Sequence, residues 1–120
     1  IEVMKEHFDF IIDTTKSSNF YKDYVFNGKI KVDKEFEDDK ILAFHHTKPH
    51  HKFHVVVVPK ADILSVATAE DMTIVKEIFE VMQDIIKKHE LHKRNYKIIN
   101  NGGSYQHSQH LHFHLVSDEE

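Results

Sequence analysis

An almost unbroken run of β-branched residues, from Phe53 to Val58, constrains the fold more than any other stretch of this chain. Valine fills positions 55 to 58, and Pro59 ends the run. A strand with one face in water alternates apolar and polar residues, whereas a strand that is apolar throughout is buried on both faces. The run therefore predicts a central strand with packed layers on both sides of its sheet.

The other segments predict one α+β domain with an antiparallel sheet. Apolar residues at helical spacing indicate an amphipathic helix over residues 1–16 and a long helix over about 70–90. Strands are expected where β-branched and aromatic residues lie between turn signals, at 34–37, 41–45, 53–58, 96–100 and 109–116. Without a linker, a repeat or a low-complexity stretch, residues 1–120 are expected to form a single domain.

Composition excludes several classes of protein. A formal net charge of −4 argues against a basic surface that follows long nucleic acids. The sequence has no run of about 18 apolar residues that would predict a membrane span. It also has no cysteine for disulfides or thiolate zinc sites. The first residues do not resemble a secretion signal, so a cytoplasmic location is expected.

Histidine is the one unusual count, because the chain has 12 of them. Nine fall in two clusters, His45 to His54 and His107 to His114. From His110 to His114 histidine alternates with apolar residues, and strand side chains repeat with period 2, so one face is expected to carry all three imidazoles. Imidazole acts near pH 7 as nucleophile, proton shuttle or metal ligand. The residues alone leave catalysis, a metal-binding row and a solvent-facing strand open.

The segment from His110 to Val116 resembles the His-φ-His-φ-His-φ-φ signature of the histidine-triad (HIT) superfamily, where φ is apolar. Other segments resemble parts of the same pattern in the expected order: 27–30 and 36–44 its first hairpin, 54–60 its central strand, and 96–102 the strand and loop before the triad. The resemblance covers about residues 25–116. It implies a HIT-like fold with a five-stranded antiparallel sheet and a long helix, to which the helix at 1–16 is an addition.

The resemblance implies hydrolysis of nucleoside 5′-monophosphate derivatives, such as phosphoramidates, through a covalent nucleotidyl-histidine intermediate. In the family pattern His112 is the nucleophile, and His110 and His114 orient it, contact phosphate oxygens and manage protons. His54 corresponds to the fourth catalytic histidine. The residues expected to bind the substrate are Asn101, Gln106, His107, Phe44, His45 and His46. Imidazoles supply the positive charge, so neither a metal nor another cofactor is expected.

Three departures from the family pattern bear on the substrate. His46 stands where many relatives carry an acidic residue for the ribose hydroxyls, and His107 replaces a hydroxyl residue that assists the leaving group. The Cys-x-x-Cys zinc pair of many bacterial relatives is replaced by Phe20 and Asp23. The structural zinc ion of those relatives is therefore not expected here. Three alternatives stay open: a dinucleoside-polyphosphate hydrolase of the same superfamily, a non-catalytic nucleotide-binding protein and a metal-binding module.

The expected partners are a purine nucleotide and a second copy of the chain, rather than nucleic acid or a membrane. HIT relatives of this size pair to form one continuous ten-stranded sheet. A strand as apolar as 55–58 would leave an exposed edge that pairing covers. The helix at 70–90 also has more apolar positions than one stripe against its own sheet requires. A homodimer is therefore expected.

Overall fold

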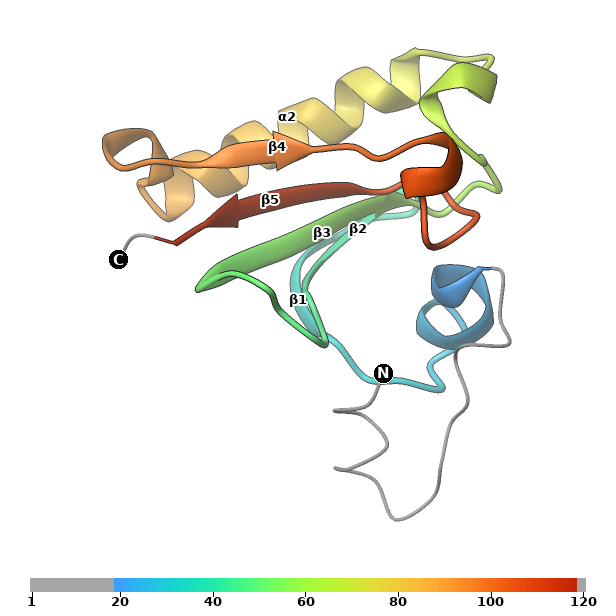
Figure 1. The fold of residues 1–120 in the computed structure, drawn as a ribbon, viewed down its shortest axis with the longest axis horizontal. Helices are drawn as coiled ribbons and strands as arrows, with labels where there is room; N and C mark the ends of the chain where they lie inside the picture. The colour runs from blue at the N-terminus through green and yellow to red at the C-terminus, as the bar shows by residue number, and fades with distance from the viewer. Residues whose placement is uncertain (1–18, 119–120) are drawn as a thin grey trace.

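A computed structural model describes residues 19–118, which form one antiparallel sheet with a long helix against it (Figure 1). The strands are β1 (Asp33–Glu37), β2 (Ile41–His45), β3 (Phe53–Pro59), β4 (Lys97–Ile99) and β5 (Phe113–Ser117). Their order in the sheet is β1-β2-β3-β5-β4, and all neighbours are antiparallel. The predicted α+β class and five-stranded sheet are confirmed. The helix predicted at 1–16 lies outside the described residues.

The strand β3 lies in the middle of the sheet, because β2 and β5 pair with its two edges. Val55 and Val57 pack toward the helix α2, whereas Val56 and Val58 pack on the opposite face, and all four are 0% exposed. The predicted burial on both faces is confirmed. The edge argument for a dimer was wrong, however, because β3 has no free edge. The outer strands are β1 and β4.

The helix α2 (Thr73–Lys88) covers one face of the sheet, within the segment predicted as 70–90 (Figure 1). Its buried residues recur at helical spacing: Val75, Ile78, Val81, Met82, Ile85 and Ile86. At the start, the Asp71 carboxylate accepts the backbone N–H of Thr73 at 2.9 Å. Glu90, in the left-handed region with φ of 55°, follows its end. In the described part of the chain, no helix has the length and apolarity to cross a membrane.

The opposite face is covered by the segment before β1, which contains a single helical turn, η2 (Tyr21–Val25), blue in Figure 1. Tyr21 and Val25 are buried there against apolar side chains of β2 and β3. Hydrogen bonds from Asn19 and Phe20 hold the segment to the loop before β5. The backbone N–H of Phe20 donates to Ser108 Oγ at 2.9 Å, and the Asn19 amide lies 3.1 Å from Nδ1 of His110. These two contacts are called the N-terminal latch below.

The strand β5 begins at Phe113, later than the predicted start at 109. Its ladder with β3 ends before Pro59, which has no backbone N–H, and the N–H of Leu111 donates to the Ile63 carbonyl at 2.7 Å instead. The predicted alternation still holds. Leu111, Phe113 and Leu115 pack on the α2 side, and the ring of His112 lies on the opposite face, against Tyr21. Three further helical turns are η3 (Val66–Thr68), η4 (Leu91–Lys93) and η5 (Gly103–Tyr105).

Candidate active site

A cavity of about 500 Å³ lies on the sheet face away from α2. Its histidines are His46, His50, His51, His54, His107, His112 and His114. Its apolar wall includes Phe20, Tyr21, Phe44 and Ile99. No carboxylate belongs to the lining that residues 19–118 provide. The cavity therefore offers nitrogen donors and ring faces, which suit an anion joined to a flat apolar group.

His112 presents an unprotonated nitrogen. Its Nδ1 lies 2.7 Å from the carbonyl oxygen of His110. A carbonyl only accepts hydrogen bonds, so Nδ1 carries the proton and the neutral ring keeps its lone pair on Nε2. Burial lowers the pKa of His112, which favours this neutral form at pH 7. The Asn100 amide donates to the His112 carbonyl at 2.9 Å and so fixes the backbone that carries the ring.

A chain of hydrogen bonds fixes the protons of His54 and His114. The backbone N–H of His50 donates to Nδ1 of His54 at 3.1 Å, so the proton of neutral His54 is on Nε2. That Nε2–H donates to Nδ1 of His114 at 2.8 Å, which leaves the proton of neutral His114 on its own Nε2. Burial lowers the pKa of both rings. His114 is thus an N–H donor beside His112, with their ring centroids 5.0 Å apart.

His46 adds a second donor by the same device. The backbone N–H of Lys48 donates to its Nδ1 at 2.9 Å, so the neutral ring carries its proton on Nε2. Burial, and then the neighbouring histidines, lower the pKa of His46 to about 4. Its ring centroid lies 4.5 Å from that of His54 and 6.0 Å from that of His114. The lone pair of His112 is therefore accompanied by two fixed N–H donors.

His46, His54 and His114 form a cluster with the spacing of a metal site, because one nitrogen from each ring lies within 4.8 Å of the others. A zinc ligand must offer a lone pair at about 2.0–2.1 Å. Backbone donors hold Nδ1 of both His46 and His54, so their Nε2 atoms carry protons instead of free lone pairs. The contact of 2.8 Å between His54 and His114 is a hydrogen bond. The cluster fits donation to an anion better than metal ligation.

Comparison with known proteins places this site in a family. The family model described as "Scavenger mRNA decapping enzyme C-term binding" matches residues 19–120. A HIT-like protein of Helicobacter pylori (strain ATCC 700392 / 26695) is 32% identical over 99 residues, which cover 79% of this chain and 92% of that protein. The chain belongs to the histidine-triad (HIT) superfamily.

Solved structures agree with this HIT assignment. A histidine triad protein from Clostridium difficile is 34% identical, with a TM-score of 0.73 over 81% of this chain and 88% of that one. A HIT family hydrolase from Legionella pneumophila is 25% identical, with a TM-score of 0.74 over 81% of this chain and 90% of that one. The predicted HIT fold is therefore confirmed for the five-stranded sheet and its helix.

Most residues predicted for the HIT site lie together. The cavity is lined by His112, His114, His54, His46, His107, Asn101 and Phe44. Gln106 does not line it, because its side-chain Nε2 donates to the Leu64 carbonyl at 2.6 Å. The expectation that Gln106 binds substrate is corrected accordingly, and its side chain instead ties the loop before β5 to the segment after β3.

His110 lies behind the cavity wall and is 1% exposed. Its Nε2–H donates to the Pro59 carbonyl at 2.6 Å, which leaves Nδ1 to accept from the Asn19 amide at 3.1 Å. Both ring nitrogens are thus occupied by the protein. The expected contact with phosphate does not fit this geometry. The expected orienting role does, because the backbone carbonyl of His110 holds the His112 ring.

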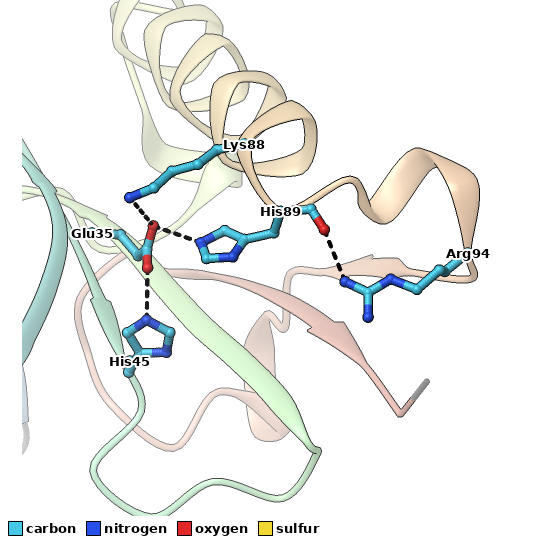
Figure 2. A network of polar contacts seen from close by, with 5 residues as sticks. All are labelled: Glu35, His45, Lys88, His89 and Arg94. Atoms are coloured by element: carbon cyan, nitrogen blue, oxygen red, sulfur yellow. Dashed lines mark hydrogen bonds and ion pairs between the residues drawn. The ribbon is translucent and has the colours of Figure 1, made fainter. Parts of the chain in front are cut away.

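His45 lies on the other side of the sheet. It follows Phe44 in β2, and neighbouring strand residues face opposite ways. Its Nε2 contacts the Glu35 carboxylate at 2.7 Å, and the second carboxylate oxygen lies 2.9 Å from Nε2 of His89 (Figure 2). The prediction that His45 binds substrate is corrected by this placement.

Sequence reasoning missed two features of the HIT site. Tyr21 and Phe20 form part of the cavity wall, yet their segment was interpreted only as lacking the zinc cysteines of bacterial relatives. Asn100 holds the His112 backbone, although the neighbouring Asn101 was selected. The tandem asparagines were a usable signal for Asn100. No local pattern predicted Tyr21, whose ring contacts are mostly with residues distant in sequence.

Proposed function

We propose that this HIT protein hydrolyses nucleoside 5′-monophosphate derivatives, phosphoramidates in particular, through a nucleotidyl intermediate on His112. One observation carries the proposal: the His110 carbonyl, 2.7 Å from Nδ1, leaves Nε2 of His112 with its lone pair in a cavity lined by donors. A nucleophile needs a free lone pair, and a phosphoryl group needs N–H donors around its oxygens. Both are supplied by the folded chain.

The reaction runs in two displacements. First, Nε2 of His112 forms a bond to the α-phosphorus while the bond from phosphorus to the leaving nitrogen breaks. Then water attacks the phosphorus, the bond to Nε2 breaks, and the electron pair returns to His112. One water molecule is consumed overall, with its hydroxyl on phosphorus and its hydrogen on the released amine. The Nε2–H groups of His114 and His46 donate to the phosphoryl oxygens or the leaving atom throughout.

The cavity lining favours an anion over a neutral ligand. Lys48 brings a cationic side chain to the same wall as His46, and no carboxylate opposes them in the described lining. The lining also continues past His54 to His50 and His51. This continuation favours a second candidate substrate with additional phosphates, a dinucleoside polyphosphate cut at a P–O–P bond. The first displacement on His112 is the same for both substrates.

The test is product analysis with both substrate classes. The protein is incubated with adenosine 5′-phosphoramidate and, separately, with diadenosine polyphosphate, beside controls without enzyme. Chromatography is expected to show AMP from the first substrate, and mass spectrometry of acid-free quenched samples is expected to show one nucleotidyl group per chain. His112→Asn is the matched control and forms no adduct. Turnover without an adduct at residue 112, or no turnover of either substrate, contradicts the proposal.

We also propose that the protein acts as a homodimer that pairs through β4 and α2. The strand β4 is an outer strand, and Ile98 on it is 36% exposed. Tyr96 and Phe79 beside it are 42% and 44% exposed, and all three line one surface hollow. The other outer strand, β1, has charged side chains at most positions. Charged side chains on an edge strand disfavour pairing with another chain.

Light scattering at micromolar concentration tests the dimer. The expected mass is twice the 14.2 kDa of the chain. Ile98→Lys places a charge in the proposed contact and is expected to give the mass of one chain. Phe36→Lys is the matched control, since Phe36 is 37% exposed on the opposite outer strand. A wild-type mass near one chain, or a dimer that Ile98→Lys leaves intact, overturns this proposal.

A further inference from the structure

Tyr21 has a buried hydroxyl with which none of the described residues pairs. The residue is only 5% exposed. Burial is the sole cause that raises its pKa, and no group in residues 19–118 forms a hydrogen bond with the phenol. A buried polar group without a partner costs about 1–3 kcal/mol. Such a group is expected to have a partner in the functional state of the protein.

The position of Tyr21 shows where that partner must come from. The residue is part of the cavity wall. Its ring centroid lies 5.1 Å from that of His112, the proposed nucleophile, and 6.1 Å from that of Phe44. His110, whose ring centroid lies 6.0 Å from that of Tyr21, already uses both nitrogens on other residues. The hydroxyl is therefore left for a ligand next to His112.

The chemistry of the phenol limits which atoms of a ligand can bind to it. Because burial raises its pKa, Tyr21 stays protonated near pH 7 and serves as a hydrogen-bond donor. An acceptor held in the cavity beside Tyr21 also lies beside His112, because the two ring centroids are 5.1 Å apart. On a nucleotide, the acceptors next to the attacked phosphorus are its own oxygens.

We infer that Tyr21 binds the substrate directly, with its hydroxyl donating a hydrogen bond to an oxygen of the phosphoryl group that His112 attacks. This inference rests on the proposed function and adds Tyr21 to the two phosphate-binding donors proposed above, His46 and His114. Hydrogen bonds to charged acceptors are among the stronger ones in proteins. Loss of the hydroxyl is expected to weaken nucleoside monophosphate binding roughly tenfold.

The experiment compares Tyr21→Phe with the wild type by calorimetry, using AMP, UMP and adenosine as ligands. Tyr24→Phe is the matched control, because it removes the same atom from the same helical turn outside the cavity lining. The expected result is about tenfold weaker binding of AMP and of UMP, with adenosine binding unchanged. Tyr24→Phe is expected to bind all three ligands like the wild type.

Thermal unfolding of the ligand-free proteins separates binding from structure. Tyr21→Phe keeps the ring and removes an unpaired group, so its Tm is expected to equal or exceed that of the wild type. Three results overturn the inference: unchanged AMP affinity, an equal loss for adenosine, or a lowered Tm without ligand. If wild-type protein binds no nucleoside monophosphate at all, the proposed function itself fails, which is a separate outcome.

Discussion

His45 and His46 are neighbours in the sequence but lie in opposite electrostatic surroundings. His46 faces the cavity, where its Nδ1 accepts from the Lys48 backbone and its closest rings are other histidines. His45 faces the side of α2, where it contacts the Glu35 carboxylate at 2.7 Å. On one side the imidazoles direct N–H donors toward a cavity whose described lining has no carboxylate. On the other, the anion is built into the protein.

The anion on that side is the Glu35 carboxylate, and both of its oxygens have partners, as Figure 2 shows. The Glu35 side chain is 7% exposed and contacts His45, His89 and Lys88. Although burial opposes ionisation, hydrogen bonds from His89 and then His45 lower the pKa of Glu35 to about 2. The partner of an imidazole, rather than its place in a histidine-rich segment, therefore decides whether it is structural or available for chemistry.

The largest effect is expected from a change at His112, the proposed nucleophile. His112→Asn removes the lone pair and is expected to lower kcat/KM by more than roughly 10³-fold, with the fold retained. His45→Asn changes the same residue type on the other face and is expected to keep kcat/KM within about threefold. Steady-state hydrolysis and circular dichroism of both variants measure this. More than a few per cent of activity in His112→Asn contradicts the mechanism.

The second prediction concerns the free energy of unfolding at acidic pH, which depends on the neutral histidines of the cavity. Folded His46 has a pKa of about 4, below its ordinary 6.5, and the pKa values of His112 and His114 are also lowered by burial. As the pH falls below 6.5, the unfolded chain binds protons that the folded chain does not, so the free energy of unfolding decreases. Each such histidine contributes up to about 1.4 kcal/mol per pH unit.

Urea unfolding between pH 7 and pH 5 measures this slope, in a window above the range where carboxylates titrate. His46→Asn is expected to reduce the slope by about one proton, because one depressed group is removed. The acid limb of kcat/KM is expected below pH 6.5, since His112 stays neutral there. A free energy of unfolding that stays constant or rises on acidification to pH 5 would refute the neutral assignment.

A smaller effect is expected from Glu35→Gln, which tests the carboxylate side. The amide cannot accept from His45 and His89 as a carboxylate does, and the change is expected to cost about 1–3 kcal/mol of stability at pH 7. Lys88→Ala, whose ammonium is mostly exposed, is expected to cost under about 1 kcal/mol. Neither change is expected to alter kcat/KM. Lost activity at full stability in Glu35→Gln would connect the two faces functionally.

The smallest expected effect is that of metal removal. The tautomers of His46 and His54 direct Nε2–H groups toward their neighbours, so a strong chelator is expected to leave both rate and Tm unchanged. Assays before and after chelator treatment, with zinc added back to one portion, measure this. A loss that zinc restores would mean that the cluster exchanges its protons for a metal.

Patterns among neighbouring residues predicted the buried faces of the strands and the turn of the first hairpin. The run from Val55 to Val58 and the alternation from Leu111 to Leu115 each reflect which face of a strand is buried, and both were confirmed. The hairpin at Asp38 was also predictable, because its carboxylate accepts the backbone N–H groups of Lys40 and Ile41 at 2.8 and 2.7 Å.

The candidate site was predicted less completely, for two physical reasons. The period of 2 already separates Phe44 from His45, so that error was avoidable. The role of Tyr21 was not predictable, because its neighbours Asn19 and Phe20 are fixed by contacts with residues 91 and 88 positions away. The sequence also could not predict which ring nitrogen of each histidine carries the proton, because this depends on backbone N–H groups such as that of His50.

The N-terminal latch has a consequence for the order in which the molecule is built. It joins Phe20 to Ser108, which lies 88 positions later in the chain. Closing so long a loop is entropically expensive and comes late in folding. A chain that ends before residue 108 contains the sequence of the β1–β2 hairpin and of β3. It also contains Asn19 and Phe20, but not their latch partners His110 and Ser108. The cavity wall that Phe20 and Tyr21 form is therefore expected to close only after residue 108 has joined the fold.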